Sequence, residues 1–169
     1  MRSAARIGDH PIHPMLIPYP FAFLSSAIAF DAAGVARNDD TLCQTAGVLT
    51  KVGIATAVVA AVPGLIDFAT RVPAGKPRQT ATVHMASNLS ALACFTAASV
   101  ARGDRARPGA AVLALEALGT AVLSLGGWLG GKLSYHHQIG VVPEEHSDRS
   151  LDSMRQDHLL RDDAIPTTP

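Results

Sequence analysis

The sequence predicts an all-α protein: a four-helix transmembrane bundle whose N- and C-termini lie on the same side, followed by a short acidic C-terminal tail. Four apolar runs are separated by short polar turns, and each is long enough to cross ~30 Å of hydrocarbon, which takes a helix of ~20 residues. Of 169 residues, 48% are hydrophobic and only 17% are charged. The stretches Val52–Ile66 and Leu89–Ala101 lack the polar face that a soluble helix bundle would need.

Polar turns set the limits of the four predicted spans, which cover about residues 18–35, 46–68, 82–101 and 109–135 within a membrane domain of residues 1–142. The segment before the first span, His10–Pro14, is expected to be extended and not helical, because proline disfavours helical geometry in the preceding residue. Pro63–Gly64 is expected to kink the second span. No internal repeat is evident in the sequence.

The composition changes after the fourth span. Residues 1–142 hold 11 Lys and Arg against 7 Asp and Glu, whereas residues 143–169 hold 3 against 7. The second stretch is therefore expected to be an acidic, partly disordered tail. The body has no basic stripe with interleaved aromatic residues, so a nucleic-acid partner is not expected. Cys43 and Cys94 form no CxxC motif and are expected to be buried small apolar residues.

An even number of spans predicts which residues share a membrane face. We call side A the face at which the first span starts, and side B the opposite face. The second span ends at side A, the third starts there and the fourth ends there. Helices packed in a bundle lie only ~10 Å apart, so residues distant in sequence gather at this face. Side A should hold His10, His13, Asp67, His84, Tyr135, His136 and His137. More Lys and Arg residues lie near side A than near side B, which indicates that side A is cytoplasmic.

The histidines of side A are the candidate ligands. His10 and His13 form an HxxH pair in which each precedes a proline, and neutral imidazoles bind zinc, copper, iron or haem. His84 lies four residues before Asn88 on one helix face, and Asn88 or Asp67 would fix its second nitrogen. The predicted metal ligands are His10, His13, Asp67 and His84, and the predicted cofactor contacts are His10, His13, His84, Asn88, Tyr135 and His136. The alternatives are purely structural: histidines packed on helix ends, and Asp67 holding Arg71.

A second group of ionisable residues belongs to side B. Asp31, Lys51 and Glu116 each lie inside a predicted span near its side-B end. A charge that faces lipid is costly, so we expect a buried charge cluster in which Lys51 lies between the two carboxylates. The alternative places each of them at the membrane interface.

The fourth span carries a glycine run with small residues at four-residue spacing: Gly126, Gly127, Gly130 and Gly131. This pattern favours close helix packing, either within the chain or in a homo-oligomer formed through this span. The alternative is a flat cofactor lying against the glycine face. Trp128 and Tyr135 are expected at the membrane interface.

Four ordered motifs, HPIHPMLIPYPFAF, AxPGLIDF, HMxxN and GGxLxYxxxxGV, resemble the bacterial membrane family called domain of unknown function 2231, over about Gly8–Val142. The resemblance implies four transmembrane helices and, since relatives are grouped with haem-bearing cytochrome b-like proteins and can be fused to Rieske-type modules, a haem or redox role. This chain lacks the cysteines of an iron–sulfur module. The family's motif positions present here are His10, His13, Asp31, Asp67, His84, Asn88 and Tyr135.

These observations support three hypotheses of function. The first is an integral protein of the bacterial inner membrane, with cytoplasmic termini, in which a His-rich site binds haem b or a transition metal and passes electrons to a redox partner protein. The second is a small transporter with a proton path along its ionisable residues. The third is a structural or assembly subunit without a cofactor. A classical hydrolase or transferase is not expected, because no nucleophile–base constellation or GxSxG motif is found.

Overall fold

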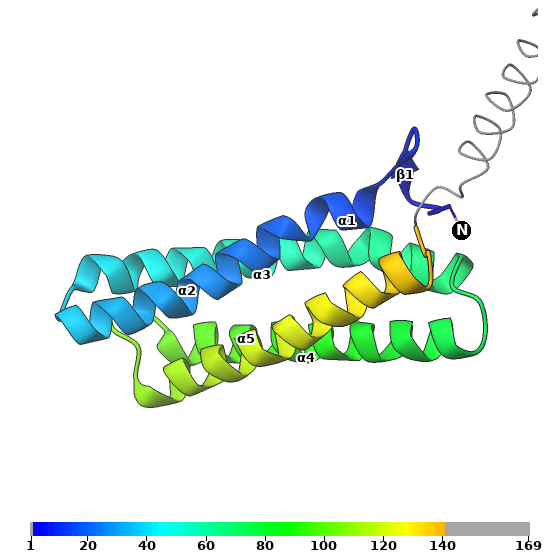
Figure 1. Cartoon of the computed structure of the whole chain (residues 1–169). Coiled ribbons are helices and arrows are strands. Elements are labelled where there is room, and N and C mark those ends of the chain that lie inside the picture. The colour runs from blue at the N-terminus through cyan, green and yellow to red at the C-terminus, as the bar shows by residue number, and fades with distance from the viewer. Residues whose placement is uncertain (1, 141–169) are drawn as a thin grey trace, which may run out of the picture.

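The computed structural model describes residues 2–140, which fold into two long helical hairpins packed as a four-helix bundle (Figure 1). Its elements in chain order are β1 (Arg6–Ile7), β2 (His10–Pro11), α1 (Ile12–Leu16), α2 (Pro18–Arg37), α3 (Asp40–Thr70), α4 (Lys76–Arg102), α5 (Ala110–Gly131) and the π-helical turn η1 (Lys132–His136). Within this part of the chain, four helical stretches are long and apolar enough to cross a membrane: Ile12–Arg37, Asp40–Thr70, Lys76–Arg102 and Ala110–His136. The predicted all-α four-span fold is confirmed.

The helices extend beyond the apolar runs that predicted them. α3 begins at Asp40 because Asp39 caps it: the Asp39 carboxylate accepts the backbone N–H groups of Thr41 and Leu42 at 2.8 and 3.3 Å. α3 also continues as one helix through Pro63. Hydropathy identifies only the part of a helix that lies in hydrocarbon, so it does not predict the polar turns at the two ends of the helix.

The expectation that His10–Pro14 is not helical is wrong for its second half. His10 and Pro11 form the short strand β2, but His13 and Pro14 lie in α1. Pro14 is the third residue of α1, where a backbone N–H would have no partner inside the helix, so its missing donor costs nothing. α1 runs almost directly into α2, since the Ile17 N–H bonds the His13 carbonyl at 3.2 Å.

Both ends of the described chain lie at the same end of the bundle. Arg2 forms an isolated backbone bridge with Gly140, and Figure 1 shows the N-terminus beside the turn that follows α5. This end is side A, as the even number of spans predicts. The predicted acidic tail, residues 143–169, lies outside the described residues.

The four long helices are arranged in a ring. α2 packs mainly on α3, and α4 packs mainly on α5, so each hairpin is held chiefly by its own two helices. The hairpins join where α3 meets α4 and where α2 meets α5. α2 and α4 are therefore diagonal across the bundle, and their side chains meet at its centre. There Leu24 and Phe95 form the middle of the apolar core with Ala91 and Leu123.

The two hairpins repeat one another in register. Adding 71 to the buried α2 residues Leu24, Ala27 and Asp31 gives the buried α4 residues Phe95, Ala98 and Arg102. Adding 66 to the buried α3 residues Thr50, Gly53 and Ala60 gives the buried α5 residues Glu116, Gly119 and Gly126. Because each repeat occupies two neighbouring places in the ring and runs in the same direction, an approximate two-fold axis along the bundle relates them.

The close contacts between neighbouring helices follow the same repeat. A Cβ on Gly53 would lie 2.5 Å from the Leu24 side chain, and one on Gly119 would lie 2.9 Å from Phe95. The structure therefore contains a repeat that the sequence did not reveal. The repeat preserves burial and backbone approach, whereas most of the residue types differ between the two copies.

Candidate two-histidine site

His13 and His84 meet near side A, at the centre of the bundle. Their ring centroids are 6.2 Å apart and their planes are nearly perpendicular, at 86°. His13 lies on α1 and His84 on α4, and the two residues are again 71 positions apart, in the register of the hairpin repeat. Each hairpin thus contributes one imidazole to the same place on the approximate two-fold axis.

Each imidazole is fixed by a backbone carbonyl of its own hairpin. His13 Nδ1 lies 2.8 Å from the Ala60 carbonyl oxygen on α3, and His84 Nδ1 lies 2.8 Å from the Gly126 carbonyl oxygen on α5. A carbonyl oxygen can only accept a hydrogen bond, so both Nδ1 atoms carry the proton and donate. In the neutral imidazole this leaves the Nε2 lone pair available, which is the state in which histidine binds a metal.

A glycine one turn after each carbonyl makes room for the ring. A Cβ on Gly64 would lie 2.7 Å from His13 Cε1, and a Cβ on Gly130 would lie 3.1 Å from His84 Cε1. Gly64 and Gly130 follow Ala60 and Gly126 by four residues, so both histidines contact the neighbouring helix in the same way. These glycines therefore admit histidine side chains of the same chain.

Gly126 of the predicted glycine run is also accounted for inside the chain, because a Cβ there would lie 2.6 Å from Asn88 Oδ1. A Cβ on Gly127 would lie 3.4 Å from the Phe21 ring, and one on Gly131 would lie 4.0 Å from Tyr135, so neither position requires a glycine for these contacts. The tight contacts explain Gly126 and Gly130 without a second copy of the chain. A homo-oligomer formed through the fourth span gains no support from them.

Asn88 lines the site but does not have the expected role. Its Nδ2 donates to the His84 carbonyl at 2.8 Å and lies 3.2 and 3.3 Å from the two nitrogens of the His84 ring. A group nearly equidistant from both nitrogens must lie over the ring face, because a place in the ring plane would clash with Cε1. The Gly126 carbonyl, and neither Asn88 nor Asp67, fixes the second nitrogen of His84.

Asp67 holds the N-terminal segment and not the histidines. Its carboxylate accepts the Ser3 hydroxyl at 2.6 Å and the backbone N–H groups of Ala4 and Ala5 at 2.7 and 3.3 Å. Both carboxylate oxygens are therefore engaged, and the arrangement differs from the alternative in which Asp67 holds Arg71.

The remaining predicted contacts lie away from the pair. His10 is exposed on β2, Tyr135 is 88% exposed, and His136 is exposed with its ring stacked edge-on against His137 at 4.8 Å. Within residues 2–140, no three His, Cys, Asp or Glu side chains converge as a metal site. The structure corrects the four-ligand centre predicted from His10, His13, Asp67 and His84 to a pair, His13 and His84.

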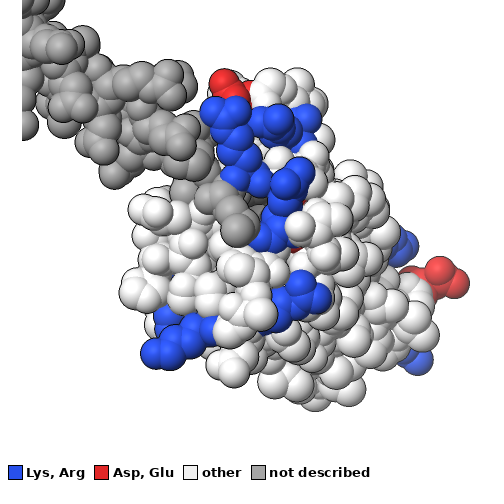
Figure 2. Space-filling model, turned by 90° about the vertical axis from the view of Figure 1, so that its right-hand side faces the viewer, with Lys and Arg blue, Asp and Glu red and all other residues white. Residues whose placement is uncertain are grey.

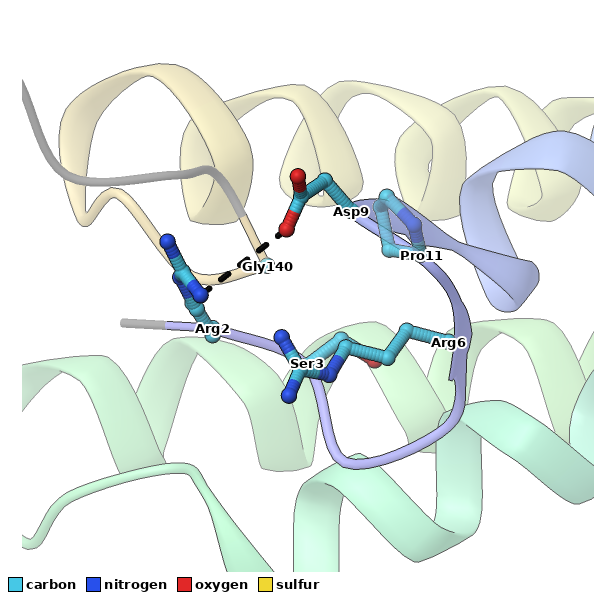
Figure 3. Close-up of a pocket in the computed structure, with 6 residues that line it drawn as sticks. All are labelled: Arg2, Ser3, Arg6, Asp9, Pro11 and Gly140. Atoms are coloured by element: carbon cyan, nitrogen blue, oxygen red, sulfur yellow. Dashed lines mark ion pairs between the residues drawn. The ribbon is translucent and has the colours of Figure 1, made fainter. Parts of the chain in front are cut away.

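Basic side chains surround this end of the molecule. Figure 2 looks onto side A and shows Lys and Arg gathered on it. A shallow recess lined by the N-terminal segment and Gly140 brings Arg2 and Arg6 together, and Arg2 pairs with Asp9 at 3.8 Å (Figure 3). The cations near side A are Arg2, Arg6, Arg71, Lys76, Arg78 and Lys132.

Near side B the structure corrects the predicted charge cluster. Asp31 and Glu116 are fully buried, as expected, but the cation between them is Arg102, which is 5% exposed. Arg102 Nη2 pairs with Asp31 Oδ2 and lies 3.4 Å from Glu116 Oε1. Lys51 is exposed on α3 and takes no part. Arg102 was not identified from the sequence as the cation of the cluster, because it ends α4 beside a charged turn. The 71-residue register between the two hairpins, which pairs Arg102 with Asp31, is the signal that would have identified it.

A four-helix bundle of spanning length, with a histidine pair near one end and a buried ion cluster near the other, defines a multi-pass integral membrane protein. A family model described as "Predicted membrane protein (DUF2231)" matches residues 9–143, and the chain belongs to this family. No curated protein and no solved structure matches the chain. The resemblance drawn from the four motifs is thereby confirmed as to family, and the haem association that it implies stays a prediction.

Proposed function

We propose that His13 and His84 would hold a haem group through their imidazoles and that the protein transfers electrons in the membrane. The observation that carries this proposal is the pair itself. Two imidazoles lie 6.2 Å apart, and each Nδ1 is fixed by a carbonyl so that its Nε2 is available. Imidazole nitrogens bind metals at ~2.0–2.1 Å, so two rings that share one ion have centroids up to about 6.4 Å apart. The observed separation suits a single shared ion.

The number of ligands favours haem over a bare metal ion. Protein zinc sites use three or four side-chain ligands, whereas a haem iron takes only its axial ligands from the protein. Among residues 2–140, His13 and His84 have no third His, Cys, Asp or Glu beside them. When bound, the haem iron would supply one-electron transfer. The chain's own contribution is to fix the orientation of the two rings through the Nδ1 hydrogen bonds, which leave each Nε2 available.

The surroundings of the pair also fit this role. The two hairpins contribute one ligand each and contact each other less extensively than their own helices do, so a flat group between them need not break either hairpin. The basic face at side A suits an acidic redox partner protein. It also favours a cytoplasmic side A in a bacterial inner membrane, because Lys and Arg are enriched on cytoplasmic faces.

The proposal is tested by the absorbance spectrum of the full chain, purified in detergent from cells supplied with haem precursor. We expect a Soret band with the α and β bands of six-coordinate haem, shifting on reduction with dithionite. His13→Ala and His84→Ala should each remove the six-coordinate signature. His10→Ala and His136→Ala, at exposed histidines outside the pair, are matched controls and should keep it.

Two results would overturn haem binding. One is a folded chain, judged by circular dichroism, that is purified without a Soret band and gains none when hemin is added. The other is equal loss of the band in His10→Ala and His84→Ala. Stoichiometric metal without a Soret band, lost in His84→Ala, would replace haem by a transition metal.

A further inference from the structure

Two acidic side chains and one basic side chain are buried together near side B. Asp31 on α2 and Glu116 on α5 are 0% exposed, and Arg102 on α4 is 5% exposed. His84 and Arg102 lie on one helix and are separated by 18 residues, or ~27 Å at 1.5 Å per residue. The cluster therefore lies near the opposite membrane face from the histidine pair and is independent of the proposed haem site.

Arg102, the one buried cation among residues 2–140, already has close partners. Arg102 Nη2 pairs with Asp31 Oδ2, and Arg102 Nη1 donates to the Cys43 carbonyl at 3.0 Å. Glu116 receives only longer contacts through Oε1, at 3.4 Å from Arg102 Nη2 and 3.4 Å from the Thr50 hydroxyl. That hydroxyl lies closer to the Ala46 carbonyl, at 3.0 Å.

Each carboxyl group keeps one buried oxygen without a partner. These are Asp31 Oδ1 and Glu116 Oε2, and the hydroxyl of Thr120, one turn after Glu116 on α5, is also unpartnered. The Cys43 backbone carbonyl and the Thr50 hydroxyl face the cluster from α3, and the Lys51 side chain is exposed. Within residues 2–140, therefore, one guanidinium faces two carboxyl groups, which would carry a net negative charge if both were ionised.

We propose that Asp31, Arg102 and Glu116 form a proton-binding site in which Glu116 carries the proton at neutral pH. An uncompensated carboxylate in a buried, low-dielectric position is strongly disfavoured, and one bound proton makes the cluster neutral. Asp31 stays ionised because it makes the closer contact with Arg102. Glu116, with the longer contacts, is the group that gains the proton.

Arg102 is the member of the cluster nearest to water on side B. Arg102 lines an open recess there with its neighbours on the turn after α4, Gly103, Asp104 and Arg105. A proton moves from water in this recess to a carboxylate oxygen of Glu116, and the reverse step returns it, so no other reactant is needed. Intramembrane carboxyl groups that are buried and paired with a cation commonly mark proton sites.

Infrared spectroscopy of the full chain in detergent tests the site, because a protonated carboxylic acid has a carbonyl stretch that a carboxylate lacks. We expect a protonated-acid band at neutral pH that shifts in D₂O. It should be lost in Glu116→Gln with the fold intact. It should also be lost in Asp31→Asn, because Glu116 then ionises to pair with Arg102.

Asp40→Asn is the matched control, since Asp40 is an exposed side-B carboxylate that pairs with Arg107. This variant should keep the whole band. The proposal is overturned if the parent protein lacks the band at neutral pH, or if the band survives in Glu116→Gln. It is also overturned if Asp31→Asn, folded by circular dichroism, keeps the band at full intensity.

Discussion

At the residue scale, Arg102 is the side chain that joins the two buried carboxyl groups of the ion cluster. In the second hairpin, Arg102 occupies the position that Asp31 has in the first. The repeat therefore brings opposite charges together on the axis near side B, whereas it brings Leu24 and Phe95 together in the middle of the bundle. Removing one partner of a buried ion pair leaves the other charge uncompensated, which costs far more than the pair contributes. Arg102 is therefore expected to matter for stability far more than any exposed cation of the chain.

Arg102→Met should destabilise the protein by about 3–5 kcal/mol, because Asp31 and Glu116 lose their cation. Lys51→Met is the control, since Lys51 was predicted to be the cation of the cluster and the structure leaves it exposed; its effect should stay within about 0.5 kcal/mol. Denaturant unfolding in detergent micelles, followed by circular dichroism, measures both. Equal effects of the two substitutions would contradict the position of Arg102 in the cluster.

At the scale of elements, side-chain bonds join segments that hydropathy treats as separate. The clearest case is the N-terminal segment with the β1–β2 hairpin, which lies outside the spans and is held at side A by the Asp67 carboxylate at the end of α3. Its last residues lead directly into α1, which carries His13. The C-terminal end of α3 therefore fixes the place where α1 begins.

Asp67→Ala should release residues 2–11 while the four long helices stay folded, because Ser3, Ala4 and Ala5 lose their common acceptor. The measurement is amide hydrogen exchange with mass spectrometry, in which peptides from this segment should exchange faster and helix peptides should not change. Asp9→Asn removes only an exposed ion pair with Arg2 and serves as the control. Unchanged exchange in Asp67→Ala would show that other contacts hold the segment.

On the scale of the whole molecule, the approximate two-fold axis organises three layers. The histidine pair lies near side A, the contact of Leu24 with Phe95 lies in the middle, and the ion cluster lies near side B. Every layer contains one pair of residues from equivalent positions of the two hairpins, and Glu116 adds a third ionisable group to the layer near side B. A ligand shared by both halves is therefore expected on the axis, where the two ligand positions are equivalent.

The orientation of these layers in the membrane is tested by labelling in intact bacteria. In a chain without Cys43 and Cys94, Ile7→Cys marks side A and Asp104→Cys marks side B, and both positions are exposed. Because the basic face at side A should be cytoplasmic, an impermeant maleimide should label only Asp104→Cys. Permeabilised cells, in which both should react, are the control. Labelling of Ile7→Cys alone would reverse the orientation.

Much of the fold followed from the sequence, and so did the meeting of two histidines. The apolar runs gave four helices, and their even number returned both ends of the described chain to side A, where His13 and His84 meet. The even number of spans, however, also predicted His10 and Asp67 in the site. It assigns a residue to a face of the membrane but gives neither the direction of its side chain nor its competing partners.

The sequence by itself determined the number, order and direction of the helices, because crossing hydrocarbon requires long apolar helices whose hydrogen bonds are satisfied within each segment. Only the tertiary structure decided which side chains face the axis and what they bind. The carbonyls that fix His13 and His84 and the glycines that admit the two rings depend on how the helices within each hairpin pack. The choice of Arg102 over Lys51 depends on how the two hairpins are rotated against each other. That rotation is set by close packing between helices distant in sequence, which no local pattern encodes.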